Sequence, residues 1–233
     1  ALIIARAAPP WVARDRVAGA RAAAEAGATA IVMDDGFQNP SLFKDLSLLV
    51  IDGGYGFGNA RVMPAGPLRE TVPRGLARAD ALVVLGTEER ILARSLNTGL
   101  PVLGARLVPG PAGQRLAGQR VLAFAGIGRP EKFFATLEAL GAALVETRSF
   151  PDHHPYGTGE IEALLARATD RNARAVTTEK DAVRLPAELS ARVEALPVTL
   201  AWRDEDAVEA LLDRVFTAPA RQPDGRAEAA KSA

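Results

Sequence analysis

The sequence contains no cysteine, which excludes disulfides, thiolate metal sites and cysteine nucleophiles together. This composition is typical of a reducing compartment, so a cytoplasmic location is the default expectation. Histidine is nearly as scarce, with only His153 and His154 in the chain. Because the two are adjacent and lack the spacing of zinc ligands on a helix, a structural zinc site is not expected.

The chain also lacks an excess of charge of either sign and any long apolar run. Its 28 basic and 28 acidic residues give a net charge of zero, so no global field attracts nucleic acid or an anionic membrane. No apolar stretch approaches the ~18 residues that a membrane span needs. The first residues do not form a basic segment followed by an apolar one, as a signal peptide would.

Short apolar runs separated by helical patterns make up most of the sequence. With 233 residues and 48% hydrophobic content, the chain can bury one large core or two small ones. The runs are apolar throughout rather than alternating, which indicates parallel sheets covered on both faces. Strands are expected at residues 29–33, 46–51, 81–85, 101–108, 120–125, 143–147, 173–177 and 196–202. Helices are expected at residues 14–26, 74–78, 88–96, 130–140, 158–168 and 206–216.

A turn-rich stretch at residues 109–118, with three glycines and two prolines, predicts a boundary between two parts of the chain. We expect a first domain over residues 1–110 and a smaller α/β subdomain over residues 119–216. Residues 217–233 have no periodicity and are expected to be disordered.

Residues 30–38 join an apolar run to two adjacent carboxylates, Asp34 and Asp35, and a glycine. In open α/β sheets ligands bind beyond the carboxyl ends of the strands, and an Asp there can hold Mg²⁺ or accept a proton from an attacking hydroxyl. The alternative is an ordinary strand end followed by a turn, which Asp and Gly favour.

The pair His153–His154 follows the strand at residues 143–147. Histidine suits proton transfer near neutral pH, and a carboxylate such as Asp35 could share its proton. A metal ligand or a solvated turn are the alternatives. In the long loop before residue 70, Arg69 could bind phosphate or carboxylate, or simply be solvated.

Thr178, Glu179, Lys180 and Asp181 follow the strand at residues 173–177. They could contact a nucleotide or substrate phosphate, or Thr178 could cap a helix whose first turn carries the acids. Both interpretations can hold together. Gly126-Ile127-Gly128 is better explained as a tight structural turn than as a phosphate loop.

Six motifs in the same order along residues 1 to about 215 resemble the tetraacyldisaccharide 4'-kinase family of lipid A biosynthesis. They read Asp-Asp-Gly-Phe-Gln-Asn at 34–39, Gly-Phe-Gly-Asn at 56–59, Pro-Ala-Gly-Pro-Leu-Arg-Glu at 64–70, Ala-Gly-Ile-Gly-x-Pro-x-x-Phe-Phe at 125–134, Phe-Pro-Asp-His-His-Pro-Tyr at 150–156 and Thr-Glu-Lys-Asp-Ala-Val at 178–183.

The resemblance implies a P-loop-kinase-like parallel sheet with helices on both faces, plus a smaller C-terminal α/β subdomain. It implies transfer of the γ-phosphate of ATP to the 4' hydroxyl of a tetraacyldisaccharide 1-phosphate, with Mg²⁺. The expected partners are ATP and the lipid disaccharide, without nucleic acid or an obligate protein partner. The full-length protein is expected on the cytoplasmic face of the inner membrane.

Site residues follow from the same resemblance. Asp34 and Asp35 would supply the catalytic carboxylate and a metal contact, with Asp35 favoured as the base and His153 as its dyad partner. Binding of substrate or nucleotide would involve Gln38, Asn59, Arg69, Glu70, Thr178, Glu179, Lys180 and Asp181.

The family's phosphate loop, Gly-x-x-x-x-Gly-Lys-Thr, does not occur in these 233 residues. We therefore expect a soluble fragment that lacks the first strand, the phosphate loop and the membrane anchor, and whose own kinase activity is impaired. The alternative is a non-catalytic module that binds the disaccharide or a nucleotide.

Overall fold

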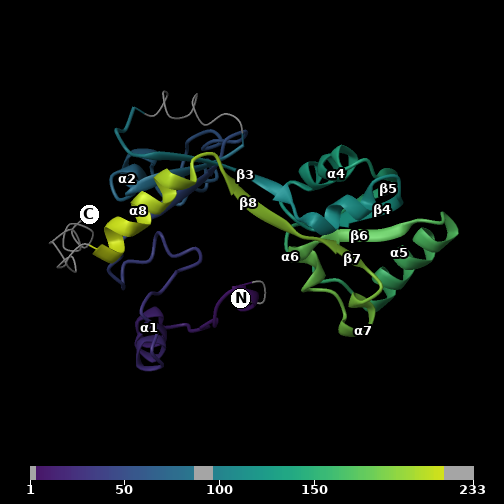
Figure 1. Ribbon diagram of the computed structural model, residues 1–233, viewed down its shortest axis with the longest axis horizontal. Coiled ribbons are helices and arrows are strands. Elements are labelled where there is room, and N and C mark those ends of the chain that lie inside the picture. Colours follow the sequence, from purple (N-terminus) through teal and green to yellow (C-terminus); the bar gives the residue numbers. More distant parts are fainter. Residues whose placement is uncertain (1–3, 87–96, 218–233) are drawn as a thin grey trace. The chain divides into compact units, whose positions relative to one another are not determined.

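The computed structural model describes residues 4–86 and 97–217 (Figure 1). The helix expected at residues 88–96 and the tail after Thr217 lie outside them. The chain forms two compact units, one of Ala1–Pro10 and Val108–Thr199, the other of Trp11–Leu107 and Leu200–Ala233. The chain passes between the units after Pro10, within strand β3 (Val102–Pro109) and within strand β8 (Val198–Trp202).

The unit built from Val108–Thr199 contains a parallel sheet with strand order β5-β4-β6-β7. The strands are β4 (Arg120–Ala125), β5 (Ala143–Ser149), β6 (Arg174–Thr178) and β7 (Glu194–Leu196), and the helices are α4 (Pro130–Ala139), α5 (Thr158–Asp170), α6 (Glu179–Ala182) and α7 (Ala187–Ser190), preceded by the 3₁₀ helix Pro111–Leu116. Helices α4 and α5 cover opposite faces of this sheet (Figure 1).

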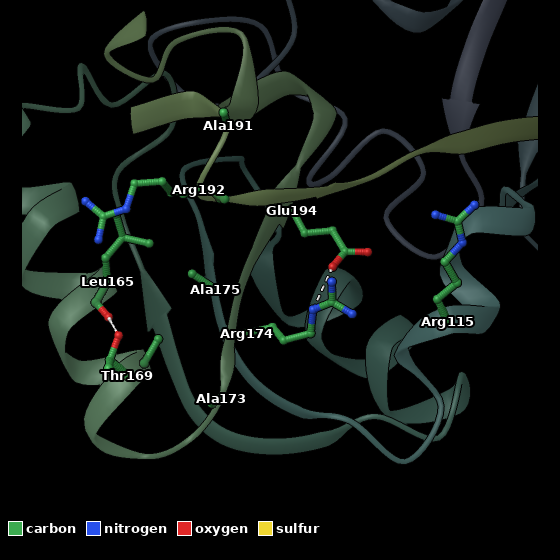
Figure 2. A pocket seen from close by; sticks show the side chains of 11 residues that line it. Arg115, Leu165, Thr169, Ala173, Arg174, Ala175, Ala191, Arg192 and Glu194 are labelled. Atoms are coloured by element: carbon green, nitrogen blue, oxygen red, sulfur yellow. Dashed lines mark hydrogen bonds and ion pairs between the residues drawn. The ribbon is translucent and has the colours of Figure 1, made fainter. Parts of the chain in front are cut away.

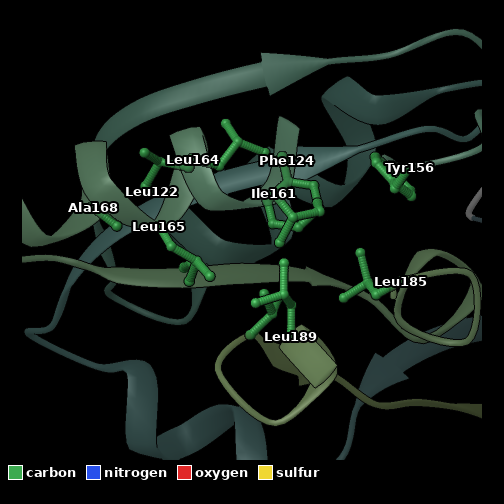
Figure 3. Packing of buried hydrophobic residues seen from close by; sticks show 11 residues of the cluster. Leu122, Phe124, Tyr156, Ile161, Leu164, Leu165, Ala168, Leu185 and Leu189 are labelled. Atoms are coloured by element: carbon green, nitrogen blue, oxygen red, sulfur yellow. The ribbon is translucent and has the colours of Figure 1, made fainter. Parts of the chain in front are cut away.

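Strand β4 supplies both faces of this unit's core because successive side chains of a strand point in opposite directions. Leu122 and Phe124 pack with Ile161 of α5, in the cluster shown in Figure 3. Val121 and Ala123 pack on the other face, with residues of α4. Every residue from Val121 to Ala125 is buried, as the uninterrupted apolar run predicts.

The spacing of apolar residues in α5 explains why this segment forms a helix on the sheet. Its buried residues Ile161, Leu164, Leu165 and Ala168 recur at intervals of three and four, so they lie on one stripe facing the sheet. Burying an apolar side chain of this size contributes about 1.5–3 kcal/mol, so this stripe holds the helix to the sheet.

The other unit contains a sheet with strand order β1-β2-β3-β8, in which β1–β2 and β2–β3 pair in parallel. The strands are β1 (Leu48–Asp52), β2 (Ala81–Leu85), β3 (Val102–Pro109) and β8 (Val198–Trp202), and the described helices are α1 (Arg16–Glu25), α2 (Val72–Leu76) and α8 (Glu205–Thr217). The short 3₁₀ helix Ile4–Arg6 belongs to the unit built from Val108–Thr199.

Alternation along β2 again divides the core. Ala81 and Val83 pack with Leu211 of α8, while Leu82 packs with Ile51 of β1 on the opposite face. Both faces of the sheet are therefore covered, and the expected α/β class with helices on both sides of parallel sheets is confirmed.

Two predicted elements are wrong. Residues 29–33 form no strand, and Ile31 and Val32 are 49% and 96% exposed. An apolar run becomes a strand only beside a strand that shares its hydrogen bonds, and no described strand pairs with this one. The single strand expected at residues 196–202 is instead divided at Pro197 into β7 and β8, since proline has no N–H to donate to a ladder.

The predicted strands at 81–85 and 120–125 have the observed bounds, and most other elements agree within two residues. Among the described residues, no helix has both the length and the apolar character that crossing a bilayer requires.

Candidate active site

Asp34 and Asp35 lie in a turn that their neighbour Phe37 anchors. Gly36 is buried, and Phe37 packs against the core around Ile51. Asp35 has a φ of 50°, in the left-handed region that Asp tolerates better than most side chains. Both carboxylates are exposed. The anchored phenyl ring therefore fixes a turn that presents two acids to solvent.

Arg69 connects this turn to the end of the long loop. Its Nη1 donates to Oδ1 and Oδ2 of Asp35 at 3.0 and 3.1 Å, and lies 3.5 Å from Oε1 of Gln38. Gln38 Nε2 donates to Oε1 of Glu70 at 3.2 Å, and Glu70 is paired with Arg78. The structure therefore brings together four predicted site residues, Asp35, Gln38, Arg69 and Glu70.

The side chain of Asn59 forms hydrogen bonds within its own loop. Its Nδ2 donates to the carbonyl of Ala65 at 2.9 Å, and its Oδ1 accepts from the amide of Arg61 at 3.1 Å. These bonds close the loop that carries the cis Met63–Pro64 peptide. The contacts assign Asn59 a role in shaping the loop, and its predicted role in binding stays a prediction.

In the other unit, three loops follow the carboxyl ends of β4, β5 and β6. They carry Gly126, the segment from Phe150 to Tyr156, and Thr178 with α6. Because parallel strands end at the same edge of a sheet, these loops meet. The amide of His153 donates to the carbonyl of Gly126 at 3.1 Å, which joins the first loop to the second.

The two adjacent histidines have different surroundings. The side chain of His153 is 84% exposed, and its backbone φ of 59° turns the chain at this point. The side chain of His154 is only 22% exposed, stacks on Phe150 with ring centroids 4.8 Å apart, and contacts Glu160 Oε2 through Nε2 at 2.7 Å. Of the two, His153 is therefore the one open to a ligand.

Asp181 is fully buried, and its carboxylate accepts hydrogen bonds from residues of two of these loops. Its Oδ1 accepts from the hydroxyl of Tyr156 at 3.0 Å and pairs with Nη2 of Arg184 at 3.2 Å. Its Oδ2 accepts from the hydroxyl of Thr178 at 2.7 Å. Burial, reinforced by the nearby Asp181 carboxylate, raises the pKa of the Tyr156 hydroxyl above its ordinary value, so the hydroxyl stays protonated as a donor.

The remaining residues of this motif are more exposed. The amide of Asp181 donates to the hydroxyl of Thr178, which confirms the predicted helix cap. Glu179 is partly buried and accepts from the amide of Val198 at 3.3 Å, and Lys180 is exposed. Lys180 is therefore the member of this motif most accessible to a ligand.

The predicted site residues thus form two groups, one in each unit. The pairing of Asp35 with His153 stays a prediction. Over residues 4–86 and 97–217, no group of three or more His, Asp and Glu side chains is placed to hold a metal ion together.

A groove of about 570 Å³ lies at the other end of β6 and β7 and includes none of the predicted site residues. Figure 2 shows the ion pair between Arg174 and Glu194 across it, with Nε and Oε2 3.1 Å apart. Arg115 and Arg192 also line it. It lies where the strands begin, so it is distinct from the loops that carry His153 and Asp181.

Sequence reasoning missed four residues near the predicted site. Tyr156 and Arg184 contact Asp181, Arg78 contacts Glu70, and Glu160 contacts His154, the neighbour of the predicted His153. Tyr156 belongs to a quoted motif, so its place beside two histidines was a usable signal. Arg184 and Arg78 gave no signal, because their importance depends on partners that only the fold brings near.

Parallel sheets flanked by helices, together with the similarity to a solved kinase structure given below, identify a P-loop-kinase-like α/β fold. The family model for tetraacyldisaccharide-1-P 4'-kinase (LpxK) matches residues 1–217, and the chain belongs to this family. The resemblance drawn from the six motifs is confirmed.

Relatives agree with this assignment. A tetraacyldisaccharide 4'-kinase of Rhodospirillum centenum is 61% identical over 212 residues, covering 91% of this chain and 63% of the relative. One of Paramagnetospirillum magneticum is 58% identical over 216 residues, covering 92% and 66%. The chain thus spans just under two thirds of the length of these relatives.

A solved structure is also similar. It is LpxK from Aquifex aeolicus, an "apo" form in complex with ATP, with a TM-score of 0.62 and 28% identity. The match covers 88% of this chain and 64% of the other.

Proposed function

We propose that this chain takes part in ATP-dependent transfer of the γ-phosphate to the 4' hydroxyl of a tetraacyldisaccharide 1-phosphate. Membership of the 4'-kinase family supports the reaction class. The complex of the Aquifex aeolicus protein with ATP supports the phosphate donor.

One observation carries the assignment of the catalytic residues. Asp35 and His153 both have exposed side chains and left-handed backbone, with φ values of 50° and 59°. Non-glycine residues seldom adopt this conformation, and it is often found at functional sites. Each turn is also held by neighbours, Asp35 by Arg69 and His153 by Gly126.

In the proposed reaction the 4' oxygen attacks the γ-phosphorus, the bond from that phosphorus to the β–γ bridging oxygen breaks, and ADP leaves. The hydroxyl proton passes to the carboxylate of Asp35, and His153 shares it. Arg69 orients Asp35 through the two contacts from its Nη1. Such reactions depend mainly on positioning and charge neutralisation, which these groups can supply.

Mg²⁺ is part of the proposal. Proteins usually hold it with one or two carboxylates together with substrate phosphates and water, and the exposed Asp34–Asp35 pair fits that donor set. Bound there, the ion would neutralise charge on the transferred phosphoryl group. We assign the ligand role chiefly to Asp34, because Asp35 is already paired with Arg69.

A chimera tests the function. This chain replaces the matching 212 residues of the Rhodospirillum centenum relative, whose other residues are kept. With radiolabelled ATP and tetraacyldisaccharide 1-phosphate, we expect the chimera to phosphorylate the lipid. We expect the 233-residue chain alone to be at least about 100-fold slower, because no Gly-x-x-x-x-Gly-Lys-Thr cradles the phosphates within it.

A folded chimera that does not phosphorylate the lipid, beside an active relative, would contradict the proposal. A chain that reaches the rate of the chimera without the added residues would overturn the expected impairment. If the chimera is inactive and yet binds the disaccharide, the non-catalytic binding module is the better account.

A further inference from the structure

The turn that carries His153 is held by few contacts of its own. The amide of His153 donates to Gly126 at 3.1 Å and to the side chain of Asp152 at 3.0 Å. Its imidazole is 84% exposed and lies 3.8 Å from the Asp152 carboxylate. What fixes the position of this ring must therefore act mainly through the backbone on either side of it.

The guanidinium of Arg184 reaches two backbone carbonyls at this turn, that of Gly126, which accepts from the His153 amide, and that of His154, which follows His153. Its Nη1 and Nη2 lie 3.5 and 3.4 Å from the carbonyl oxygen of Gly126, the same oxygen that accepts from the His153 amide. Nη1 also lies 3.5 Å from the carbonyl of His154. These contacts are long, but all three converge from one planar, permanently charged group.

The side chain of Arg184 is itself held in place by Asp181 and Lys180. Its Nη2 pairs with Oδ1 of the fully buried Asp181 at 3.2 Å, and its Nε donates to the carbonyl of Lys180 at 2.9 Å. Asp181 is held in turn by Tyr156 and Thr178. An arginine whose guanidinium has partners on every side loses little freedom when it contacts the turn.

We propose that Arg184 is a positioning residue that holds the turn of His153 for catalysis, with Asp181 as its buried anchor. This inference rests on the proposed function of His153. Arg184 lies in none of the six motifs, and its side chain is only 22% exposed.

The substitution Arg184→Lys keeps the positive charge but removes the forked guanidinium, so it separates the effect of the charge from that of the contacts to the two carbonyls. In Arg184→Lys the ion pair with Asp181 can persist, but a single ammonium cannot also contact both carbonyls. Arg184→Gln removes the charge and leaves Asp181 buried without its cation. This variant is therefore informative only if the protein still folds. Arg192→Gln is the matched control, because Arg192 is an exposed arginine of the same unit, away from these loops.

The first readout does not depend on catalysis. The chain has only two histidines, so selective ¹⁵N-histidine labelling of the 233-residue chain gives two backbone amide signals. His153→Ala assigns them. We expect Arg184→Lys to accelerate hydrogen exchange at the His153 amide about tenfold, the ratio that corresponds to one hydrogen bond. Exchange in Arg192→Gln should match the parent chain.

The second readout is a double-mutant cycle in the active chimera. Arg184→Lys is expected to lower kcat about 100-fold, the scale of a misplaced catalytic group, with KM for both substrates within about twofold. In a His153→Ala background the same substitution should change kcat less than about threefold, because its effect passes through His153.

Unchanged exchange at His153 with unchanged kcat would overturn the proposal. An equal loss of kcat with and without His153 would overturn it too, since Arg184 would then act by another route. If His153→Ala keeps full turnover, the proposed dyad is wrong, and the exchange rates alone decide whether Arg184 holds the turn.

Discussion

At the scale of single residues, neighbouring positions in the chain have opposite roles. His153 projects into solvent, whereas His154 stacks on Phe150 and contacts Glu160. Likewise Lys180 is exposed, whereas the adjacent Asp181 is fully buried. In each motif one residue is thus available to a ligand and the next one fixes the loop.

The hydroxyl of Tyr156 gives a prediction about pH. Tyr156→Phe removes the donor to buried Asp181, so we expect a loss of about 1–3 kcal/mol in the free energy of unfolding at pH 8. Because the pKa of Tyr156 is raised in the folded protein, its stabilisation is complete below pH 10 and declines as the pH rises above it.

Urea unfolding at pH 8 and at higher pH measures this. The gap between parent and Tyr156→Phe should narrow above about pH 10, where tyrosine ionises in the unfolded chain. Tyr55→Phe is the control, since Tyr55 is the other tyrosine and is 58% exposed. A gap of constant size at every pH would contradict the account.

At the scale of elements, local pattern predicted most of the fold. The uninterrupted apolar run of strand β4 and the three-and-four spacing of apolar residues in helix α5 match their burial, so the local sequence was sufficient to predict both. The run at residues 29–33 was equally apolar, but strand formation depends on a partner that no local pattern encodes. The candidate site followed the same division: the motifs pointed to Asp35 and His153, whose roles stay a prediction, whereas the contacts of Arg184 depend on loops that only the fold brings together.

The turn after β4 gives a prediction at this scale. A Cβ on Gly126 would lie 2.8 Å from the hydroxyl of Tyr156 and 3.2 Å from Oδ1 of Asp181, whereas one on Gly128 would meet only Asp152 Oδ2, at 3.9 Å. We expect Gly126→Ala to lower the free energy of unfolding by about 1–3 kcal/mol, the usual cost of overpacking.

Gly128→Ala is the matched control two residues away and should change stability by less than about 0.5 kcal/mol. Chemical unfolding of both variants measures the difference. Equal stability of the two would mean that the turn after β4 is not closely packed against Tyr156 and Asp181.

At the scale of the whole molecule, the proposed chemistry divides between the two units. Asp35 with Arg69 belongs to one, and His153 with Arg184 to the other. Each unit has its own sheet and core, so each can present the side chain that we propose to be catalytic from a rigid base. The central claim is that these two side chains act on one proton.

The most direct test is kcat of four chimeras: parent, Asp35→Asn, His153→Ala and the double variant. Each single change is expected to lower kcat about 100-fold or more, the usual contribution of acid–base catalysis. We predict that the double variant is no slower than the slower single variant by more than about threefold, because residues that act as a unit are not additive. A double variant whose loss equals the product of the two single losses would contradict the dyad.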